Sequence, residues 1–287
     1  MKFSLILCTL GRDKEIEDFL GSLYCQVYKN YELIVVDQNE DDRVKDIIDR
    51  YKNKIDELKY FRVNFKGLSR GRNFGLLQVQ GDIVAFPDDD CKYPNNILLE
   101  VKNRFERDKI DFLSCISLDE ASGVESNGRW RKNKMPIHKN GLFGTCISYT
   151  IFVKVECVKG KELSFDERLG VGADTPFQSA EETDFIYQLL LSGCKGIYYP
   201  EICIYHPLKI IEYDERTIER AYQYAMGLGA FFRKHVNDSE LLLEFCRLLI
   251  RAGGGVLYNI LKMNWGGVKF YYKVLSGRWK GFITFKP

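Results

Sequence analysis

Mostly apolar runs alternate with amphipathic stretches along the first half of the chain. Three of these runs have the pattern of strands buried on both faces: Phe3–Thr9, Tyr31–Asp37 and Asp82–Phe86. Between them we expect helices at residues 13–27, 43–54 and 71–80 and a short strand at 60–63. Strands that alternate with helices predict a wound α/β fold with a mostly parallel sheet flanked by helices.

The second half of the chain has a weaker version of the same pattern. We expect a helix at residues 96–109, a strand at 111–116, a helix at 184–191 and short strands at 196–199 and 202–205. The polar segment 119–140 contains Gly and Pro and predicts a mobile loop, in which Trp130 either stacks on a sugar or anchors the loop. After residue 207 only helices are expected. The predicted domains are therefore residues 1–207 and a helical region at 208–287.

Polar side chains stand where three of the predicted strands end. Thr9 closes the first strand, Asp37 closes the second, and Asp88-Asp89-Asp90 follow the third after Pro87. Ligands of wound α/β sheets bind beyond the carboxyl ends of the strands. The sequence therefore predicts a binding site at this edge of the sheet, although an acid at a strand end can also simply cap a turn.

The acidic triplet has the composition of a site for Mg²⁺ or Mn²⁺, which prefer oxygen ligands and balance phosphate charge. In an extended chain, side chains two residues apart point the same way, so Asp88 and Asp90 would share a face. Asp89 would then point away and serve the structure. The alternative is a solvated acidic turn, which the buried strand directly before the triplet disfavours.

The composition, 45% hydrophobic and 29% charged, is that of a folded protein, and the net charge is only +2. We therefore expect no nucleic acid partner. Nine cysteines without a Cys-x-x-Cys pair are typical of reduced thiols in the cytosol. The first apolar run is too short for a signal peptide, and no apolar stretch reaches the roughly 18 residues of a membrane span. The predicted location is cytoplasmic, and a peripheral position on the inner face of the cell membrane is compatible with this prediction.

Six segments, taken in order, resemble the motifs of bacterial family-2 glycosyltransferases of the GT-A fold, over about residues 1 to 207. They are Ser4–Arg12, Val35–Asn39, Gly67–Gly75, Phe86–Pro94, Phe165–Gly170 and Ala180–Phe185. The resemblance implies a nucleoside-diphosphate sugar donor, with a UDP-sugar favoured, and a glycan or lipid-linked acceptor in surface polysaccharide synthesis. It implies donor contacts from Thr9, Gly11, Arg12, Asp37, Gly67, Arg70, Arg72, Asn73, Asp88 and Asp89.

The same resemblance implies Asp90 as the main metal ligand, with Asp88 beside it. His206 follows a predicted strand and is either a late metal or phosphate contact or a structural histidine. Arg70 and Arg72 suit phosphate geometry, although each can instead pair with a surface acid.

Membership of this family implies inversion at the anomeric carbon, for which a carboxylate takes the proton of the acceptor hydroxyl. Glu182 occupies the matching position, although Ala180 replaces the usual Gly and Glu182 the usual Asp. Glu181 and Asp184 remain alternatives, and all three acids also suit the start of a helix.

The region from Leu241 to Pro287 has eight basic residues and one acid, so it carries +7 and the rest of the chain −5. Lys269, Lys273, Ser276 and Lys280 form a stripe at helical spacing among aromatic residues. A basic amphipathic helix of this kind predicts contact with an anionic membrane surface. The alternative is packing on the catalytic domain or on a second subunit.

Two other functions fit less well. Sugar-nucleotide nucleotidyltransferases have a glycine-rich phosphate loop after the first strand, where this chain offers only Gly11. A non-catalytic sugar- or membrane-binding member of the fold would not need acids both at residues 88–90 and at residues 181–184.

Overall fold

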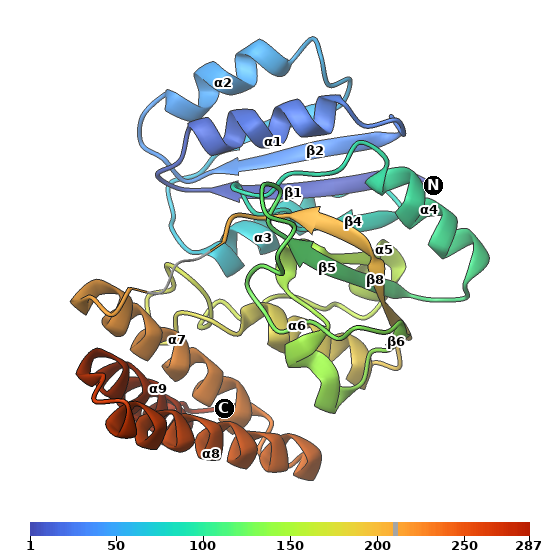
Figure 1. The fold of residues 1–287 in the computed structure, drawn as a ribbon. Coiled ribbons are helices and arrows are strands. Elements are labelled where there is room, and N and C mark those ends of the chain that lie inside the picture. Colours follow the sequence, from blue (N-terminus) through green and yellow to red (C-terminus); the bar gives the residue numbers. More distant parts are fainter. Residues whose placement is uncertain (209–211) are drawn as a thin grey trace. The chain divides into compact units, whose positions relative to one another are not determined.

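The structure, a computed structural model, describes residues 1–208 and 212–287. The chain forms two compact units (Figure 1). The first comprises Met1–Ser164 and Phe185–Lys209, and the second comprises Phe165–Asp184 and Ile210–Pro287. The segment Phe165–Asp184 belongs with the C-terminal helices, and the domain boundary after residue 207 stays a prediction.

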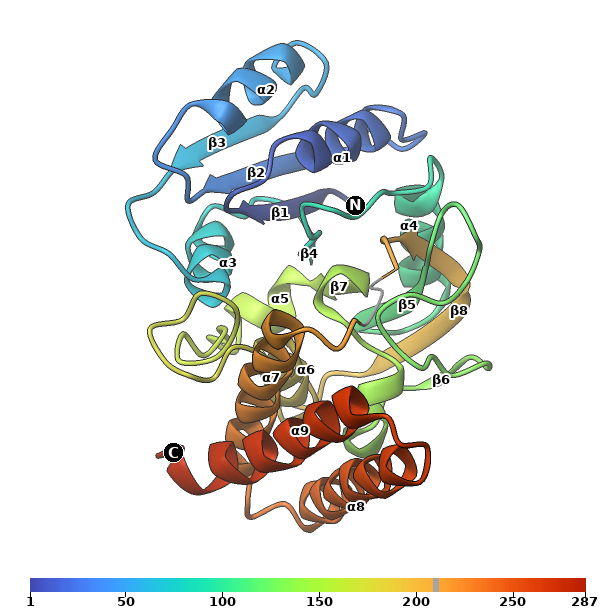
Figure 2. The same ribbon diagram turned by 60° about the vertical axis from the view of Figure 1, so that its left-hand side comes forward.

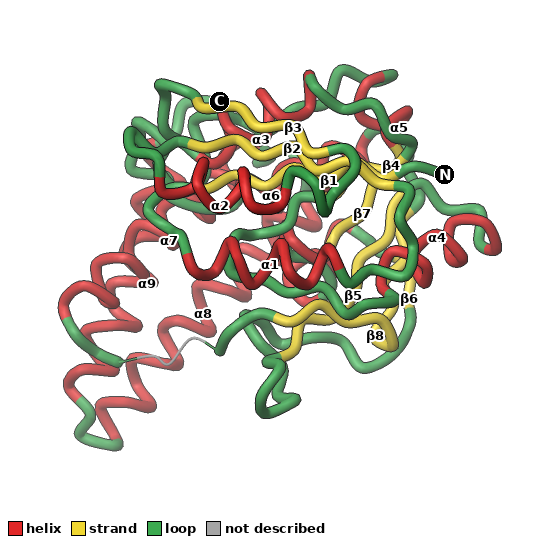
Figure 3. The backbone as a smooth tube through the Cα atoms, turned by 90° about the horizontal axis from the view of Figure 1, so that it is seen from above, coloured by secondary structure: helices red, strands yellow, loops and turns green. Residues whose placement is uncertain are grey.

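An eight-stranded sheet forms the centre of the first unit, with strand order β3-β2-β1-β4-β7-β5-β8-β6 (Figure 3). The strands are β1 Phe3–Thr9, β2 Tyr31–Asp37, β3 Leu58–Arg62, β4 Ile83–Ala85, β5 Phe112–Leu118, β6 Met135–Pro136, β7 Ile151–Lys154 and β8 Gly196–Tyr205. β3, β2, β1 and β4 are parallel neighbours, as are β5 and β8, whereas β7 and β6 run antiparallel to theirs. The predicted mixed α/β fold with a mostly parallel sheet is confirmed.

The helices of the first unit are α1 Lys14–Tyr24, α2 Arg43–Tyr51, α3 Leu68–Leu77, α4 Ile97–Arg107 and α5 Val155–Lys159. Two 3₁₀ helices lie at Lys139–Gly144 and Ser148–Thr150. α6, Glu181–Leu191, starts with residues of the second unit and continues with residues of the first. The second unit also contains α7 Glu215–Lys234, α8 Ser239–Leu261 and α9 Trp265–Thr284.

Alternate side chains of β1 serve the two faces of the sheet. Leu5 and Leu7 are fully buried in a core that includes residues of α1, α2 and α4. Ile6 points to the opposite face, where α3 comes so close that a Cβ atom at Gly75 would overlap the Ile6 side chain. This close packing places the first half of α3, with Arg72, near the ends of β1 and β4.

The second half of the first unit differs from the prediction in three places. β7 and α5 were not predicted, because their sequence has no clear period in so short a span. The two strands expected around Pro200 form one strand, β8, whose register with β5 shifts between Cys115 and Ile116. The segment predicted as a mobile loop contains β6 and buries Trp130, whose ring stacks on Tyr198 at 6.0 Å. Trp130 is thus a loop anchor, not a sugar platform.

The second unit is a helical bundle in which α9 packs against both α7 and α8 (Figure 2). Glycines allow the close approach of α9 to α7: a Cβ atom at Gly281 would overlap the carbonyl of Met226. Leu169 and Phe177 join Met226 and Phe285 in a small apolar core, so the segment Phe165–Asp184 is held by these helices. Within the described residues, no helix has both the length and the apolar character needed to cross a membrane.

Candidate active site

The sheet brings the polar ends of three strands together. Thr9 lies directly opposite Asp37 in the register of β1 and β2. The Thr9 hydroxyl donates a hydrogen bond of 2.8 Å to Asp89, which follows β4. The carboxyl edge of the sheet therefore gathers the residues that the sequence placed at strand ends.

The acidic triplet forms a turn, in which the Asp88 carbonyl accepts a hydrogen bond of 3.2 Å from the Cys91 amide. The predicted extended conformation is therefore wrong, and so is the reason given for the pairing of Asp88 with Asp90. The turn nevertheless brings these two carboxylates together, while it directs Asp89 toward Thr9 at the end of β1.

Asp88 and Asp90 converge with His206, which follows β8. One potential ligand atom from each of the three side chains lies within 4.8 Å of the others. Two carboxylates and one imidazole form a donor set that suits Mn²⁺ and Mg²⁺. The residues thus fit the expected ion, and the metal site itself stays a prediction.

The surroundings of His206 fix its orientation. Its Nε2 lies 2.9 Å from Asp90, and its Nδ1 lies 2.9 Å from both the Pro207 carbonyl and the Asn127 amide nitrogen. The Pro207 carbonyl can only accept and the Asn127 amide nitrogen can only donate, so which of them bonds to Nδ1 depends on the tautomer, while in either case Nε2 faces Asp90. The Tyr149 ring stacks on the imidazole at 4.7 Å. No sequence signal pointed to Asn127 or Tyr149, since both come from segments far from the motifs.

Two arginines partly balance the charge of the triplet. The Arg12 guanidinium lies 2.8 Å from Asp90 and 3.5 Å from Asp89, and that of Arg72 lies 3.2 Å from Asp88. Arg72 is almost fully buried, so its guanidinium is held in place and positions the Asp88 carboxylate with which it pairs. Arg12 is more exposed and can rearrange when a ligand binds.

The triplet remains electrostatically unfavourable despite Arg12. Burial raises the pKa of Asp89 to about 7, although the Thr9 hydrogen bond and the Arg12 charge act in the opposite direction. The charges of Asp88 and Asp90 add to the rise. A further positive charge at the triplet would therefore be stabilised.

Asp37 is fully buried, and both of its oxygens have partners. One accepts hydrogen bonds from the Asn39 amide at 2.9 Å and the Asn39 side chain at 2.8 Å, and the other accepts one of 2.6 Å from Tyr60. Asn39 in turn accepts a bond of 2.7 Å from the Gly11 amide. Asp37 thus holds the loop after β1 in place, and its expected contact with a nucleobase stays a prediction.

The remaining donor-site candidates flank this edge. Gly11 and Gly67 have positive φ angles of 76° and 114°, which glycine adopts without strain. Gly67 precedes α3, on which Arg70 and Asn73 lie. The Arg70 guanidinium stacks on Phe65 at 4.4 Å, whereas Arg72 of the same helix faces Asp88.

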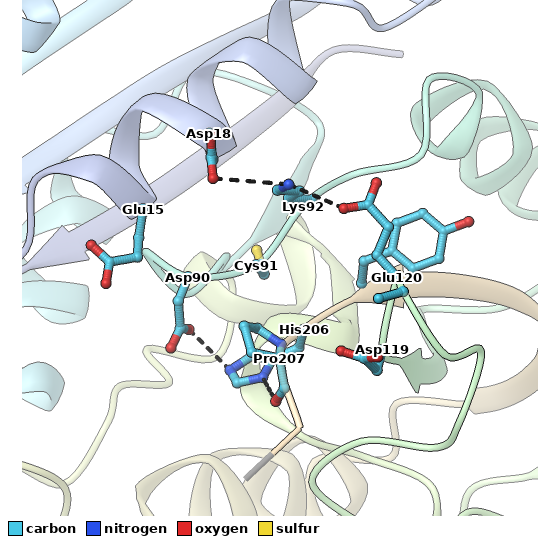
Figure 4. Close-up of a pocket in the computed structure, with 11 residues that line it drawn as sticks. Glu15, Asp18, Asp90, Cys91, Lys92, Asp119, Glu120, His206 and Pro207 are labelled. Atoms are coloured by element: carbon cyan, nitrogen blue, oxygen red, sulfur yellow. Dashed lines mark hydrogen bonds and ion pairs between the residues drawn. The ribbon is translucent and has the colours of Figure 1, made fainter.

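A cavity of about 240 Å³ lies beside Asp90 and His206 (Figure 4). Its other charged walls come from α1, the triplet's flank and the loop after β5: Glu15, Asp18, Lys92, Asp119 and Glu120. Lys92 pairs with Glu120 at 3.0 Å and with Asp18 at 3.8 Å. The sequence did not reveal this cavity, because its walls are distant along the chain. Carboxylates accept hydrogen bonds from hydroxyl groups, so the lining suits a small polyhydroxy group.

The candidate bases lie at the start of α6, in the second unit. Asp184 is fully buried and lies 2.9 Å from Lys234 and 2.7 Å from His235. Lys234 also pairs at 2.8 Å with Asp166, whose pKa is lowered because Arg168 and Lys234 outweigh the effect of burial. Glu181 is buried and Glu182 is partly exposed.

The profile of glycosyl transferase family 2 matches residues 4–158. This range contains Thr9, Asp37 and the acidic triplet, whereas His206 lies outside it. The chain belongs to glycosyl transferase family 2. The family that the sequence motifs resemble is thereby confirmed.

Two curated relatives indicate the activities found among similar chains. The poly(ribitol-phosphate) β-N-acetylglucosaminyltransferase TarS of Staphylococcus aureus is 34% identical over 187 residues, which is 62% of this chain and 32% of TarS. A GalNAc(5)-diNAcBac-PP-undecaprenol β-1,3-glucosyltransferase of Campylobacter jejuni is 36% identical over 91 residues, 31% of this chain and 29% of that protein. This chain matches about a third of the length of these relatives.

Solved structures share the GT-A fold. The mannosyltransferase PcManGT of Pyrobaculum calidifontis, solved with GDP-Man and Mn²⁺, has a TM-score of 0.68 at 14% identity and covers 98% of this chain and 86% of its own. Residues 1–349 of S. aureus TarS, solved with UDP-GlcNAc, have a TM-score of 0.62 at 18% identity, with coverage of 98% and 92%.

Proposed function

We propose that this protein is an inverting, metal-dependent glycosyltransferase that uses a nucleoside-diphosphate sugar. The observation that carries the proposal is the convergence of Asp88, Asp90 and His206 at the carboxyl edge of the sheet, beside Thr9 and Asp37. Membership of glycosyl transferase family 2 supports it. In this proposal the nucleotide lies over the ends of β1 and β2 and the diphosphate lies at the acidic turn.

The chain's own residues provide the charge arrangement that transfer requires. Asp88, Asp90 and His206 would hold Mn²⁺ or Mg²⁺, which when bound balances the charge of the diphosphate leaving group. Arg72 fixes Asp88, and the Pro207 carbonyl and Tyr149 fix the His206 ring. Arg12 can exchange its bond with Asp90 for one with the diphosphate, because its guanidinium suits phosphate oxygens.

Glu182 is our proposed base, which takes the proton from the acceptor hydroxyl as that oxygen attacks the anomeric carbon. Its two neighbours suit this role less well. Asp184 is engaged by Lys234 and His235, so proton uptake there would break a buried ionic cluster. Glu181 is buried, whereas Glu182 is partly exposed.

The relatives support a proposal for the donor and the acceptor. A UDP-sugar is the favoured donor, as UDP-GlcNAc was bound in the TarS structure. We propose a glycan or lipid-linked acceptor in the synthesis of a surface polysaccharide, as TarS and the Campylobacter enzyme act on a poly(ribitol-phosphate) and an undecaprenol-linked glycan. The enzyme would then work at the inner face of the cell membrane.

The decisive experiment screens nucleotide sugars for Mn²⁺-dependent binding and slow donor hydrolysis. A hit should depend on Asp90, and Asp90→Asn should reduce turnover at least 100-fold, because one of the two carboxylates at the metal site is lost. The matched control is Asp49→Asn, at an exposed aspartate of α2 that pairs with Lys52. Wild-type-like turnover by Asp90→Asn would contradict the proposal.

A further inference from the structure

The turn between α8 and α9 carries apolar side chains that nothing in the described structure covers. Leu261 is 82% exposed, Met263 78%, Trp265 69% and Leu257 65%. Tyr258 and Ile260 are also exposed. We call residues 257–265 the hairpin tip. Apolar residues gathered at such exposure mark an interaction site.

The apolar surface continues along α8. Leu243, Ile250 and Leu257 are exposed and follow one another at intervals of seven residues, so they lie on one side of the helix. The opposite side of α8 holds Phe245, Leu248 and Ala252, which are buried. α8 therefore has two apolar faces, and in the part of the chain that the structure describes only one of them is packed against other residues.

The exposed face is basic as well as apolar. Arg247, Arg251 and Lys262 are exposed, and no acid follows Glu244 in the chain. The stripe predicted on α9 is less available, because Lys269 lies 3.3 Å from Glu215 and Lys273 lies 3.5 Å from Glu219, both on α7. Positive charge thus exceeds negative charge along this part of α8 and at its tip, where Glu244 pairs with Arg247 and no acid follows in the chain.

We propose that the hairpin tip and the exposed face of α8 dock on a membrane that contains anionic lipids. The proposal rests on the proposed function, because it identifies the surface that brings the enzyme to its lipid-linked acceptor. Leu257, Leu261 and Met263 enter the boundary between headgroups and acyl chains, Trp265 lies at headgroup level, and the three basic side chains contact lipid phosphates. α8 and α9 lie in the interface, in agreement with the lack of a spanning helix in the described residues.

Charge distinguishes this occupant from a second copy of the chain. If two copies paired through this face, Arg247, Arg251 and Lys262 would meet the same three cations of the partner. Glu244 is the nearest acid, and it already pairs with Arg247 at 3.3 Å. Such an interface would bring like charges together, which costs free energy, whereas an anionic membrane gains it.

The test measures binding of the full chain to phosphatidylcholine vesicles with and without phosphatidylglycerol, in low salt. The tip variant Leu257→Gln/Leu261→Gln/Met263→Gln keeps the charge and should bind both kinds of vesicle at least tenfold more weakly. The charge variant Arg247→Gln/Arg251→Gln/Lys262→Gln keeps the apolar tip and should lose the preference for anionic vesicles, at about fivefold per charge. Leu77→Gln, at an equally exposed leucine of the first unit, should bind as the wild type does.

Tryptophan fluorescence reports the depth of the tip directly. Trp130 is buried, so in a Trp279→Phe background Trp265 is the exposed reporter, and its emission should shift to the blue with anionic vesicles. Circular dichroism shows that each variant is folded. Unchanged vesicle binding by the tip variant overturns the proposal, as does a lipid-free dimer that this variant converts to a monomer. Vesicle binding needs neither donor nor acceptor, so failed sugar transfer with intact docking would count against the proposed function alone.

Discussion

His206 shows how a single side chain acquires a role through its neighbours. The Pro207 carbonyl, Asn127 and the Tyr149 ring together hold the imidazole so that Nε2 faces Asp90. The sequence indicated only that a histidine follows a strand. The neighbours that orient it come from a loop and a 3₁₀ helix, and no local pattern could have connected them to residue 206.

From this geometry we expect His206→Ala to weaken Mn²⁺ binding by at least tenfold, as measured by isothermal titration. Asn127→Ala should weaken Mn²⁺ binding by about tenfold, the lower end of the range for residues that orient a metal ligand without contacting the metal. His138→Ala is the matched control, since His138 lies outside the cluster. Equal Mn²⁺ affinity in His206→Ala and the wild type would exclude this residue as a ligand.

Glu32 is a second residue whose role the sequence hid, since it interrupts an otherwise apolar strand. Its side chain is fully buried, lies 2.6 Å from Lys59 and accepts a hydrogen bond of 2.5 Å from Ser4. Burial alone would raise the pKa of Glu32, but Lys59, Ser4 and the Gln80 amide outweigh it and lower the pKa below 4.5. Glu32 therefore joins β1, β2 and β3 through charge instead of apolar contact.

The sign of this shift sets the expected pH dependence. Because the folded-state pKa is lowered, the stabilisation from Glu32 is fully present above pH 4.5 and is lost as the pH falls through the folded-state pKa. Glu32→Gln should lower the free energy of unfolding at pH 7 by about 1–3 kcal/mol and flatten its decline in acid. Urea titrations from pH 7 to 3 measure both, with the exposed Glu57→Gln as control. A decline in acid as steep as that of the wild type would contradict this account.

At the scale of elements, periodicity located most helices and strands within a few residues, because their burial is governed by the sequence itself. It missed β7 and α5, which are short and follow each other directly. It also treated β8 as two strands, because Pro200 lies where its pairing with β5 shifts register. In these places the structure depends on pairing with strands that are distant in the sequence, and a short stretch of sequence carries no information about such partners.

Two helical glycines should respond in opposite ways to the same substitution. Gly254 lies inside α8 with no atom within 4 Å of a Cβ position, whereas a Cβ atom at Gly281 of α9 would overlap the Met226 carbonyl. Gly254→Ala should raise the free energy of unfolding by about 1 kcal/mol, the difference in helix propensity. Gly281→Ala should lower it by about 1–3 kcal/mol through overpacking. Chemical denaturation measures both, and a destabilised Gly254→Ala would indicate that α8 needs its glycine for another reason.

At the scale of the whole molecule, the sequence placed Thr9, Asp37 and the acidic triplet at one edge of the sheet. It did not indicate that the segment Phe165–Asp184 belongs with the C-terminal helices. The family resemblance extends over about residues 1 to 207, yet within this range Ser179 bonds to α7 and Phe177 packs on Phe285, just after α9. The chain leaves the first unit at residue 165 and returns to it at residue 185, and the amino-acid composition does not change visibly at either point. The candidate metal ligands Asp88, Asp90 and His206 all belong to the first unit, although 115 residues, Cys91 to Tyr205, separate Asp90 from His206 in the sequence.

This placement predicts that a metal stabilises the fold. Asp88, Asp90 and His206 come from chain segments that converge only when the sheet forms, so Mn²⁺ should bind the folded state in preference to the unfolded one. At a free concentration 100-fold above its Kd, Mn²⁺ should stabilise the wild type by about 2.7 kcal/mol, and Asp90→Asn should lose most of this gain. A second cluster, Asp111 with Cys157 and Cys194, offers softer ligands, so Cys157→Ser should keep the Mn²⁺ effect. Calorimetry of the three proteins with and without Mn²⁺ decides the matter: an equal gain in Asp90→Asn, or its loss in Cys157→Ser, would place the ion away from the acidic turn.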